Sequence, residues 1–164
     1  MPDAFGARLL DALLDSWERN NTILLNLVRV LPEGGLAARA TADSPSVSEM
    51  LTHVHHERMI SVFENAPEFA GAVPEKEWVS ESDPERIALM LTESAQRVRD
   101  AVKARIEAGQ DLELDFAHPV LLIQLLIFHE GYHHGQIKLA LKLSGQAVTD
   151  EEAGPITWAV WRQK

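Results

Sequence analysis

The chain contains no cysteine. A disulfide framework, a thiolate nucleophile and a cysteine-based zinc site are therefore excluded. Disulfides are typical of secreted chains, so we expect an intracellular protein and a cytoplasmic location. The first residues, MPDAFGARLL, also lack the basic start and the apolar stretch that mark a signal peptide.

Long apolar runs are absent as well. The longest, from Val120 to Phe128, is interrupted by Gln124 and is far too short to cross a bilayer. Basic residues are outnumbered, 15 against 25 acidic ones, which gives a formal charge of −10. Anionic lipids and phosphate backbones repel such a surface. We therefore expect neither a membrane nor a nucleic acid as a partner.

The chain does carry four long segments of helical periodicity. Helices are predicted over about 3–31, 46–65, 84–108 and 119–144, and no alternating strand pattern or internal repeat is visible. The 164 residues suffice for one domain, 1–164, with a buried core. We predict an all-α fold, a four-helix bundle with a short C-terminal tail. Trp158 and Trp161 should pack that tail across the bundle, because exposed indoles forgo a large burial energy.

Local signals mark several helix ends. Ser46 and Glu49 form an S-x-x-E capping box, which predicts the start of the second helix. Asp83 is a predicted N-cap of the third helix, and Gly109 stands just beyond its last turn. The connection 71–82 is long for a bundle, so it either contributes to function or is flexible.

The segment 128–136, FHEGYHHGQ, contains the pattern H-E-x-x-H on the fourth helix. His129 and His133 lie one turn apart, on the same side as Leu122, Leu125 and Leu126, and this side is expected to face the core. Two imidazoles placed in this way can bind one metal ion. Tyr132 could line a pocket beside them, although a packed core tyrosine is the simpler interpretation.

The opposite side of this helix carries His134 and Lys138, which are expected to face solvent or a partner. Gly131 and Gly135 also point away from the histidine pair. This patch of small residues would let another helix, such as one from a second subunit, pack closely.

The second helix supplies the candidate third ligand. Three histidines stand within 53–56. His53 lies at the edge of the apolar stripe and is the best partner for the pair, with His56 and Glu57 as reserves. His55 projects about 160° away from His53 on a helix of ideal geometry and cannot join the same site.

The pattern H-E-x-x-H is also that of zinc proteases. In those enzymes the glutamate, here Glu130, activates a metal-bound water, and a third ligand follows downstream. Glu151 or Glu152 could nominally be that ligand. No strand edge is predicted that would hold a peptide substrate, so we rank a hydrolase of this kind behind other functions.

His53 early in the second helix, followed by His129-x-x-x-His133 and Gly135-Gln136, resembles the DinB-like metalloenzymes. That group is related to bacillithiol- and mycothiol-dependent transferases and isomerases. The resemblance covers nearly the whole chain and implies a DinB/YfiT-like, up-down-down-up bundle, often in a homodimer. It also implies a divalent metal ion bound by His53, His129 and His133. The family commonly has arginine where this chain has His134, which would change any substrate or dimer contact made there.

Three neutral nitrogen ligands and an open position describe a catalytic metal site. Zinc, nickel, iron and manganese all accept such ligands. The ion would lower the pKa of a bound water, giving a hydrolase, or of a low-molecular-weight thiol, giving an S-transferase that acts on a small-molecule substrate. The resemblance favours the thiol. Glu57 and Gln136 are the candidate catalytic residues that would orient a ligand or accept its proton.

The alternative from another class is a non-catalytic metal-binding or scaffold protein of the stress response. In that case the ion only ties the second helix to the fourth, and its removal should lower the melting temperature strongly.

Overall fold

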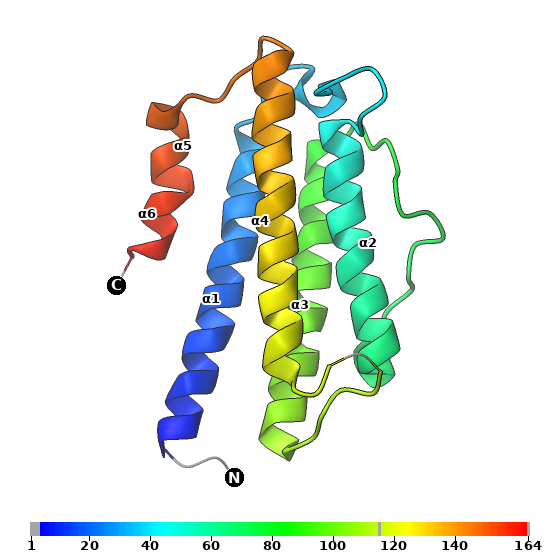
Figure 1. Cartoon of the computed structure of the whole chain (residues 1–164), viewed down its shortest axis with the longest axis vertical. Coiled ribbons are helices and arrows are strands. Elements are labelled where there is room, and N and C mark those ends of the chain that lie inside the picture. The colour runs from blue at the N-terminus through cyan, green and yellow to red at the C-terminus, as the bar shows by residue number, and fades with distance from the viewer. Residues whose placement is uncertain (1–3, 115, 164) are drawn as a thin grey trace.

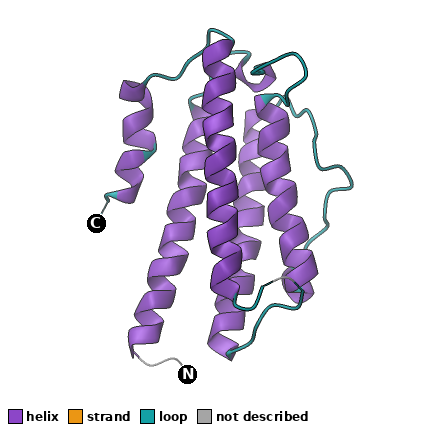
Figure 2. Ribbon diagram, in the orientation of Figure 1, coloured by secondary structure: helices purple, strands orange, loops and turns teal. Residues whose placement is uncertain are grey.

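The computed structural model describes residues 4–114 and 116–163. The described residues form a helical bundle without strands (Figures 1 and 2). Its four long helices are α1 (Ala4–Arg29), α2 (Val47–Asn65), α3 (Pro84–Ala108) and α4 (Pro119–Leu143), and α5 (Asp150–Ile156) and α6 (Trp158–Trp161) follow them. Two single-turn 3-10 helices, η1 (Gly35–Ala37) and η2 (Pro67–Phe69), lie in the connections. The predicted all-α bundle with a short C-terminal tail is confirmed.

The direction of the helices explains the long connection. In Figure 1, α1 runs upward, α2 and α3 both run downward, and α4 runs upward again. The segment 66–83 must therefore return along the length of α2. Two hydroxyls of α2 fix it there. Thr52 Oγ1 accepts a hydrogen bond from Val79 N (3.1 Å) and donates to Val79 O (2.8 Å), and Ser48 Oγ pairs in the same way with Glu81 N (2.7 Å) and O (2.6 Å).

The predicted caps are confirmed. Ser46 Oγ accepts from Glu49 N (3.2 Å) while a Glu49 carboxylate oxygen accepts from Ser46 N (2.7 Å), which completes the capping box of α2. The hydrogen bond from Ser46 N, with further help from Arg39, holds the pKa of Glu49 below its usual value. Asp83 caps α3, and Gly109 ends it in the left-handed conformation (φ 63°) that glycine adopts without strain.

The apolar core has two parts, separated by a polar layer. One part surrounds Trp17 and the other surrounds Leu51. Between them, each of the four long helices contributes a buried polar residue: Asn20, Arg58, Ser94 and Glu130. Buried polar groups require hydrogen-bond partners, so this layer fixes how the four helices meet at mid-height.

The tail packs on α1, but its indoles do not become buried. Val160 of α6 is buried, and Arg19 Nη1 donates to its carbonyl oxygen (2.5 Å). Trp158 and Trp161 remain 72% and 41% exposed, so the prediction that both indoles are buried is wrong. The reason is that α6 turns Val160, and not its tryptophans, toward α1. Helix α5 was not predicted, although Thr149 and Glu152 form a second capping box, T-x-x-E, at its start.

The orientation of α4 was only partly predicted. Leu122 and Leu126 are buried, but Leu125 is exposed. Large apolar residues surround this helix, so periodicity alone does not identify the face that points to the core. An exposed apolar stripe results, formed by Leu121, Leu125, Phe128, Tyr132, Leu139 and Leu143. Within the described residues no helix is both long and apolar enough to span a bilayer.

Candidate metal centre

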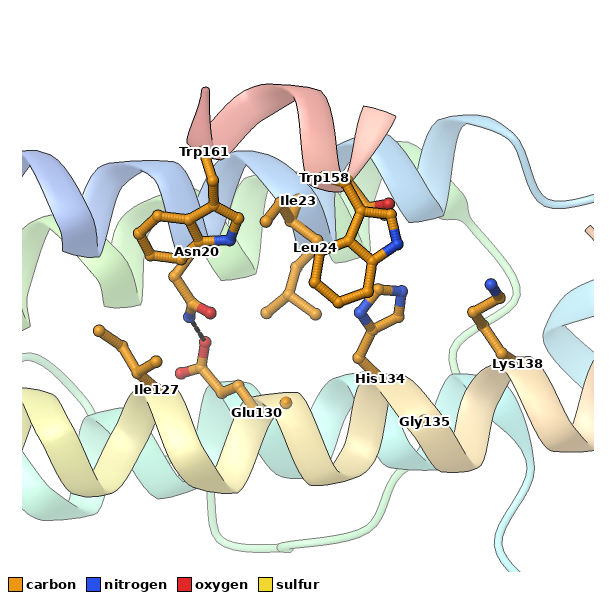
Figure 3. A pocket seen from close by; sticks show the side chains of 12 residues that line it. Asn20, Ile23, Leu24, Ile127, Glu130, His134, Gly135, Lys138, Trp158 and Trp161 are labelled. Carbon is orange, nitrogen blue, oxygen red and sulfur yellow. Dashed lines mark hydrogen bonds between the residues drawn. The ribbon is translucent and has the colours of Figure 1, made fainter. Parts of the chain in front are cut away.

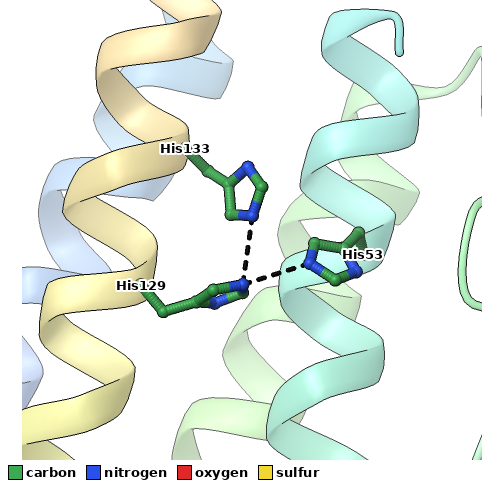
Figure 4. Close-up of side chains that lie close together, drawn as sticks. All are labelled: His53, His129 and His133. Atoms are coloured by element: carbon green, nitrogen blue, oxygen red, sulfur yellow. Dashed lines mark hydrogen bonds between the residues drawn. The ribbon is translucent and has the colours of Figure 1, made fainter. Parts of the chain in front are cut away.

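Three histidines from two helices converge near the middle of the bundle. His53 comes from α2, and His129 and His133 come from successive turns of α4 (Figure 4). The Nε2 atom of His129 lies 3.1 Å from that of His53 and 3.0 Å from that of His133. Two nitrogen ligands that each lie about 2.1 Å from one ion are roughly 3.0–3.4 Å apart. These two spacings, with ligand atoms of all three rings within 4.8 Å of one another, are compatible with a single divalent ion.

Ordinary hydrogen bonds cannot satisfy this arrangement. An imidazole nitrogen offers either one N–H or one lone pair in the ring plane. His129 Nε2 faces two nitrogens and can form a proper hydrogen bond with only one of them. A cation at the point of convergence would accept a lone pair from each ring, so the donor set fits a metal ion better than it fits a hydrogen-bonded cluster.

The protonation of the rings agrees with that fit. Burial, together with the neighbouring imidazoles, lowers the pKa of His53 and of His133 to about 4. Both rings are therefore neutral at physiological pH. Neutral imidazole is the form that binds metal ions, so an ion would not have to displace protons from these two rings.

The long connection forms one wall of the site. Trp78 stacks on His53, with ring centroids 4.0 Å apart and planes inclined by 6°. Glu77 Oε1 lies 2.9 Å from His53 Nδ1, but it is not aligned with that nitrogen for a hydrogen bond. Neither residue was predicted from the sequence, where the only hint was the unusual length of this loop.

The two predicted catalytic residues lie beside the histidines. Glu57, Glu77 and His53 form a second group whose possible ligand atoms are within 4.8 Å of one another. Gln136 Nε2 donates to the hydroxyl of Tyr132 (2.9 Å), and the Tyr132 ring meets His133 edge-on. Tyr132 is 59% exposed. It is therefore a rim residue of the site and not a packed core tyrosine.

The other histidines of α2 lie outside the three-histidine group. His55 Nδ1 is 2.8 Å from the carbonyl oxygen of Met90 on α3, so it points away from the site as predicted. His56 Nδ1 is 3.4 Å from Glu57 Oε1. Among the described residues, neither belongs to a group that could hold a metal ion.

Glu130 belongs to the polar layer and not to the histidine site. Its carboxylate accepts two hydrogen bonds from Arg58, at 2.6 and 2.7 Å, and one from Asn20 at 2.5 Å. Arg58 and Glu130 are 0% and 1% exposed. A carboxylate held in this way is not free to activate water, as the zinc-protease hypothesis requires.

The downstream ligand of that hypothesis is missing too. Glu152 caps α5, and neither Glu151 nor Glu152 joins a possible metal group in the described part of the chain. The motif H-E-x-x-H here places two candidate metal ligands and one structural carboxylate.

The profile of the DinB family matches residues 1–153. This range includes all four long helices and the three converging histidines. No curated protein and no solved structure gives a significant match.

Proposed function

The chain belongs to the DinB family, and we propose that His53, His129 and His133 bind one divalent metal ion that assists the transfer of a low-molecular-weight thiol to a small electrophilic substrate. The convergence of the three Nε2 atoms carries this proposal. Zinc, nickel, iron and manganese are all compatible with three imidazole ligands.

A catalytic site fits the surroundings better than a structural one. Three protein ligands leave at least one position for an exchangeable ligand, whereas structural zinc sites usually have four protein ligands. His129 is only partly buried. Trp78 and Tyr132, which lie against the other two histidines, are exposed. A cosubstrate could therefore approach from the side between α2 and α4.

A bound divalent ion would lower the pKa of a thiol placed at its open position. The chain has no cysteine of its own, so the thiol must come from solution, and the cytosol keeps such thiols reduced. Glu77, close to His53 Nδ1, would orient that ring. Trp78 gives the site a flat apolar wall.

Glu57 and Gln136 would act on the cosubstrates directly. Glu57 would accept the proton of the thiol, and Gln136 would donate a hydrogen bond to the electrophile. A bond forms between the thiol sulfur and the electrophilic carbon of the substrate. At the same time the bond between that carbon and its leaving group breaks, and the leaving group departs with the electron pair. The proton ends on Glu57 and then passes to solvent.

The test has two stages. Elemental analysis should find about one ion per chain in the wild type and in the control His56→Ala, and at least tenfold less in His133→Ala. The metal-loaded wild type should then conjugate glutathione, bacillithiol or mycothiol to a chloroaromatic or epoxide electrophile, and His133→Ala should not. Equally low metal content in all three proteins, after growth with each metal supplied, would contradict the proposed metal site.

The homodimer expected from the resemblance is also part of this proposal. The exposed stripe on α4 is a continuous apolar surface on one helix face, and such surfaces mark interaction sites. A second copy of the chain would cover it by two-fold packing of α4 on α4.

A further inference from the structure

A cavity of about 380 Å³ lies on the side of α4 away from the three histidines. It is enclosed by α4, α1 and the α6 segment (Figure 3). His134 and Lys138 lie on the side of α4 away from the histidine pair, as predicted, and both line this cavity. Lys138 remains 34% exposed to solvent, whereas His134 is covered by the chain's own C-terminal segment. Its volume falls in the usual range of small-molecule sites, about 300–1,000 Å³.

Two glycines leave the room for this cavity. Gly131 and Gly135 line it, and a Cβ atom built on either one meets no other group within 4 Å. Glycine weakens a helix relative to alanine, and here no neighbour requires it for close packing. The close helix contact predicted at these glycines is replaced by open space.

The walls of the cavity are aromatic. The indoles of Trp158 and Trp161 lie over it from α6, opposite Ile127 of α4 (Figure 3). Ile23 and Leu24 of α1 complete the apolar surface. Exposed indoles at the edge of a cavity can stack on a flat apolar ligand, because such stacking buries a large area with defined geometry.

The polar groups give the cavity one positive charge that is only weakly compensated. Lys138 Nζ lies 3.6 Å from Asp150, whose carboxylate is fully exposed and therefore attracts it weakly. Glu130 also lines the cavity, but Arg58 already neutralises it. His134 Nε2 is buried without a hydrogen-bond partner among the described residues. A buried polar atom of this kind requires a partner, which a ligand could supply.

We propose that this cavity binds a small aromatic carboxylate. Its ring would lie between the indoles of Trp158 and Trp161, above Gly131 and Gly135. Its carboxylate would accept hydrogen bonds from Lys138 and His134. The site shares no side chain with the three-histidine group, because the adjacent residues His133 and His134 point to different sides of α4.

Calorimetric titration with 1-naphthylacetate tests this proposal, with the uncharged 1-naphthylacetamide as the matched probe. The wild type should bind one carboxylate per chain, and the amide at least tenfold more weakly. Lys138→Met should weaken binding of the carboxylate at least tenfold. Lys142→Met, which removes a lysine outside the cavity lining, should leave it unchanged.

Two further variants keep the result clear. Gly135→Leu fills the cavity and should abolish binding without lowering the melting temperature. His133→Ala, prepared free of metal, should still bind, which separates this site from the proposed metal site. Absence of binding to the wild type at millimolar probe would overturn the proposal. So would unchanged binding in both Lys138→Met and Gly135→Leu, or loss of binding in His133→Ala that has kept its fold by circular dichroism.

Discussion

Trp78 lies flat against His53, with 4.0 Å between the ring centroids. The two residues are separated by the whole second half of α2 and by most of the 66–83 connection, and hydrogen bonds from Ser48 and Thr52 bring them together. The connection is therefore part of the candidate metal site, and changes in it should alter the positions of the histidines.

Metal binding should quench the fluorescence of Trp78. Cobalt and nickel ions quench an indole at short range, and Trp78 is stacked on a proposed ligand. Titration of the apo-protein with Ni²⁺ should lower the emission of the wild type and of the control Trp158→Phe, but hardly that of Trp78→Phe. Equal quenching in all three proteins would place the ion elsewhere.

The pair Arg58–Glu130 should dominate the stability of the polar layer. Removal of one partner from a buried ion pair costs about 3–5 kcal/mol, because the other charge stays buried. We expect Arg58→Ala to lower the free energy of unfolding by that amount in urea titrations. The double variant Arg58→Met/Glu130→Leu should recover most of it. A loss below about 1 kcal/mol in Arg58→Ala would show that water reaches the layer.

The capping box should make stability depend on pH in the acidic range. The pKa of Glu49 is lower in the folded chain than its usual 4.5. The charged carboxylate therefore contributes its full stabilisation above pH 4.5, and this stabilisation is lost as the pH falls through the folded pKa. At pH 7, Glu49→Ala should lower the free energy of unfolding by ~1 kcal/mol relative to wild type, which corresponds to a Tm lower by about 2–4 °C for a chain of this length. At pH 3 less of this carboxyl is charged than at pH 7, and the difference should shrink.

A matched control separates this effect from general changes of charge. Glu64→Ala removes an exposed glutamate from the same helix, and its melting temperature should differ little from that of wild type at either pH. If Glu49→Ala shows the same deficit at pH 7 and pH 3, the stabilisation does not depend on the charge of Glu49.

The exposed stripe on α4 should hold two copies of the chain together. Phe128 and Leu125 stand in the N-terminal half of the stripe and are exposed in the single chain. We expect light scattering to give a dimer for the wild type and a monomer for Phe128→Glu, because a buried unpaired charge is strongly unfavourable. Phe63→Glu, at an exposed position on α2, should remain dimeric. A monomeric wild type at micromolar concentration would contradict the proposed dimer.

The sequence was most informative where a structure depends on neighbours in the chain. Ser46, Asp83 and Gly109 fixed helix ends because caps act within one turn. The spacing of His129 and His133 fixed their common face for the same reason. The partners of Arg58 come from the other three long helices, and Trp78 reaches His53 only through the return path of the loop. Such contacts depend on how distant segments meet, which local patterns do not encode.

Neighbouring residues of α4 point to three different surroundings. His129 and His133 approach His53 of α2, Glu130 and His134 line the cavity beside α1 and the tail, and Phe128 points outward. Each further residue turns a helix by about 100°. An insertion or deletion of one codon between Gln124 and Phe128 would therefore rotate every group beyond it onto the wrong neighbour. This stretch should accept substitutions far more readily than any change of length.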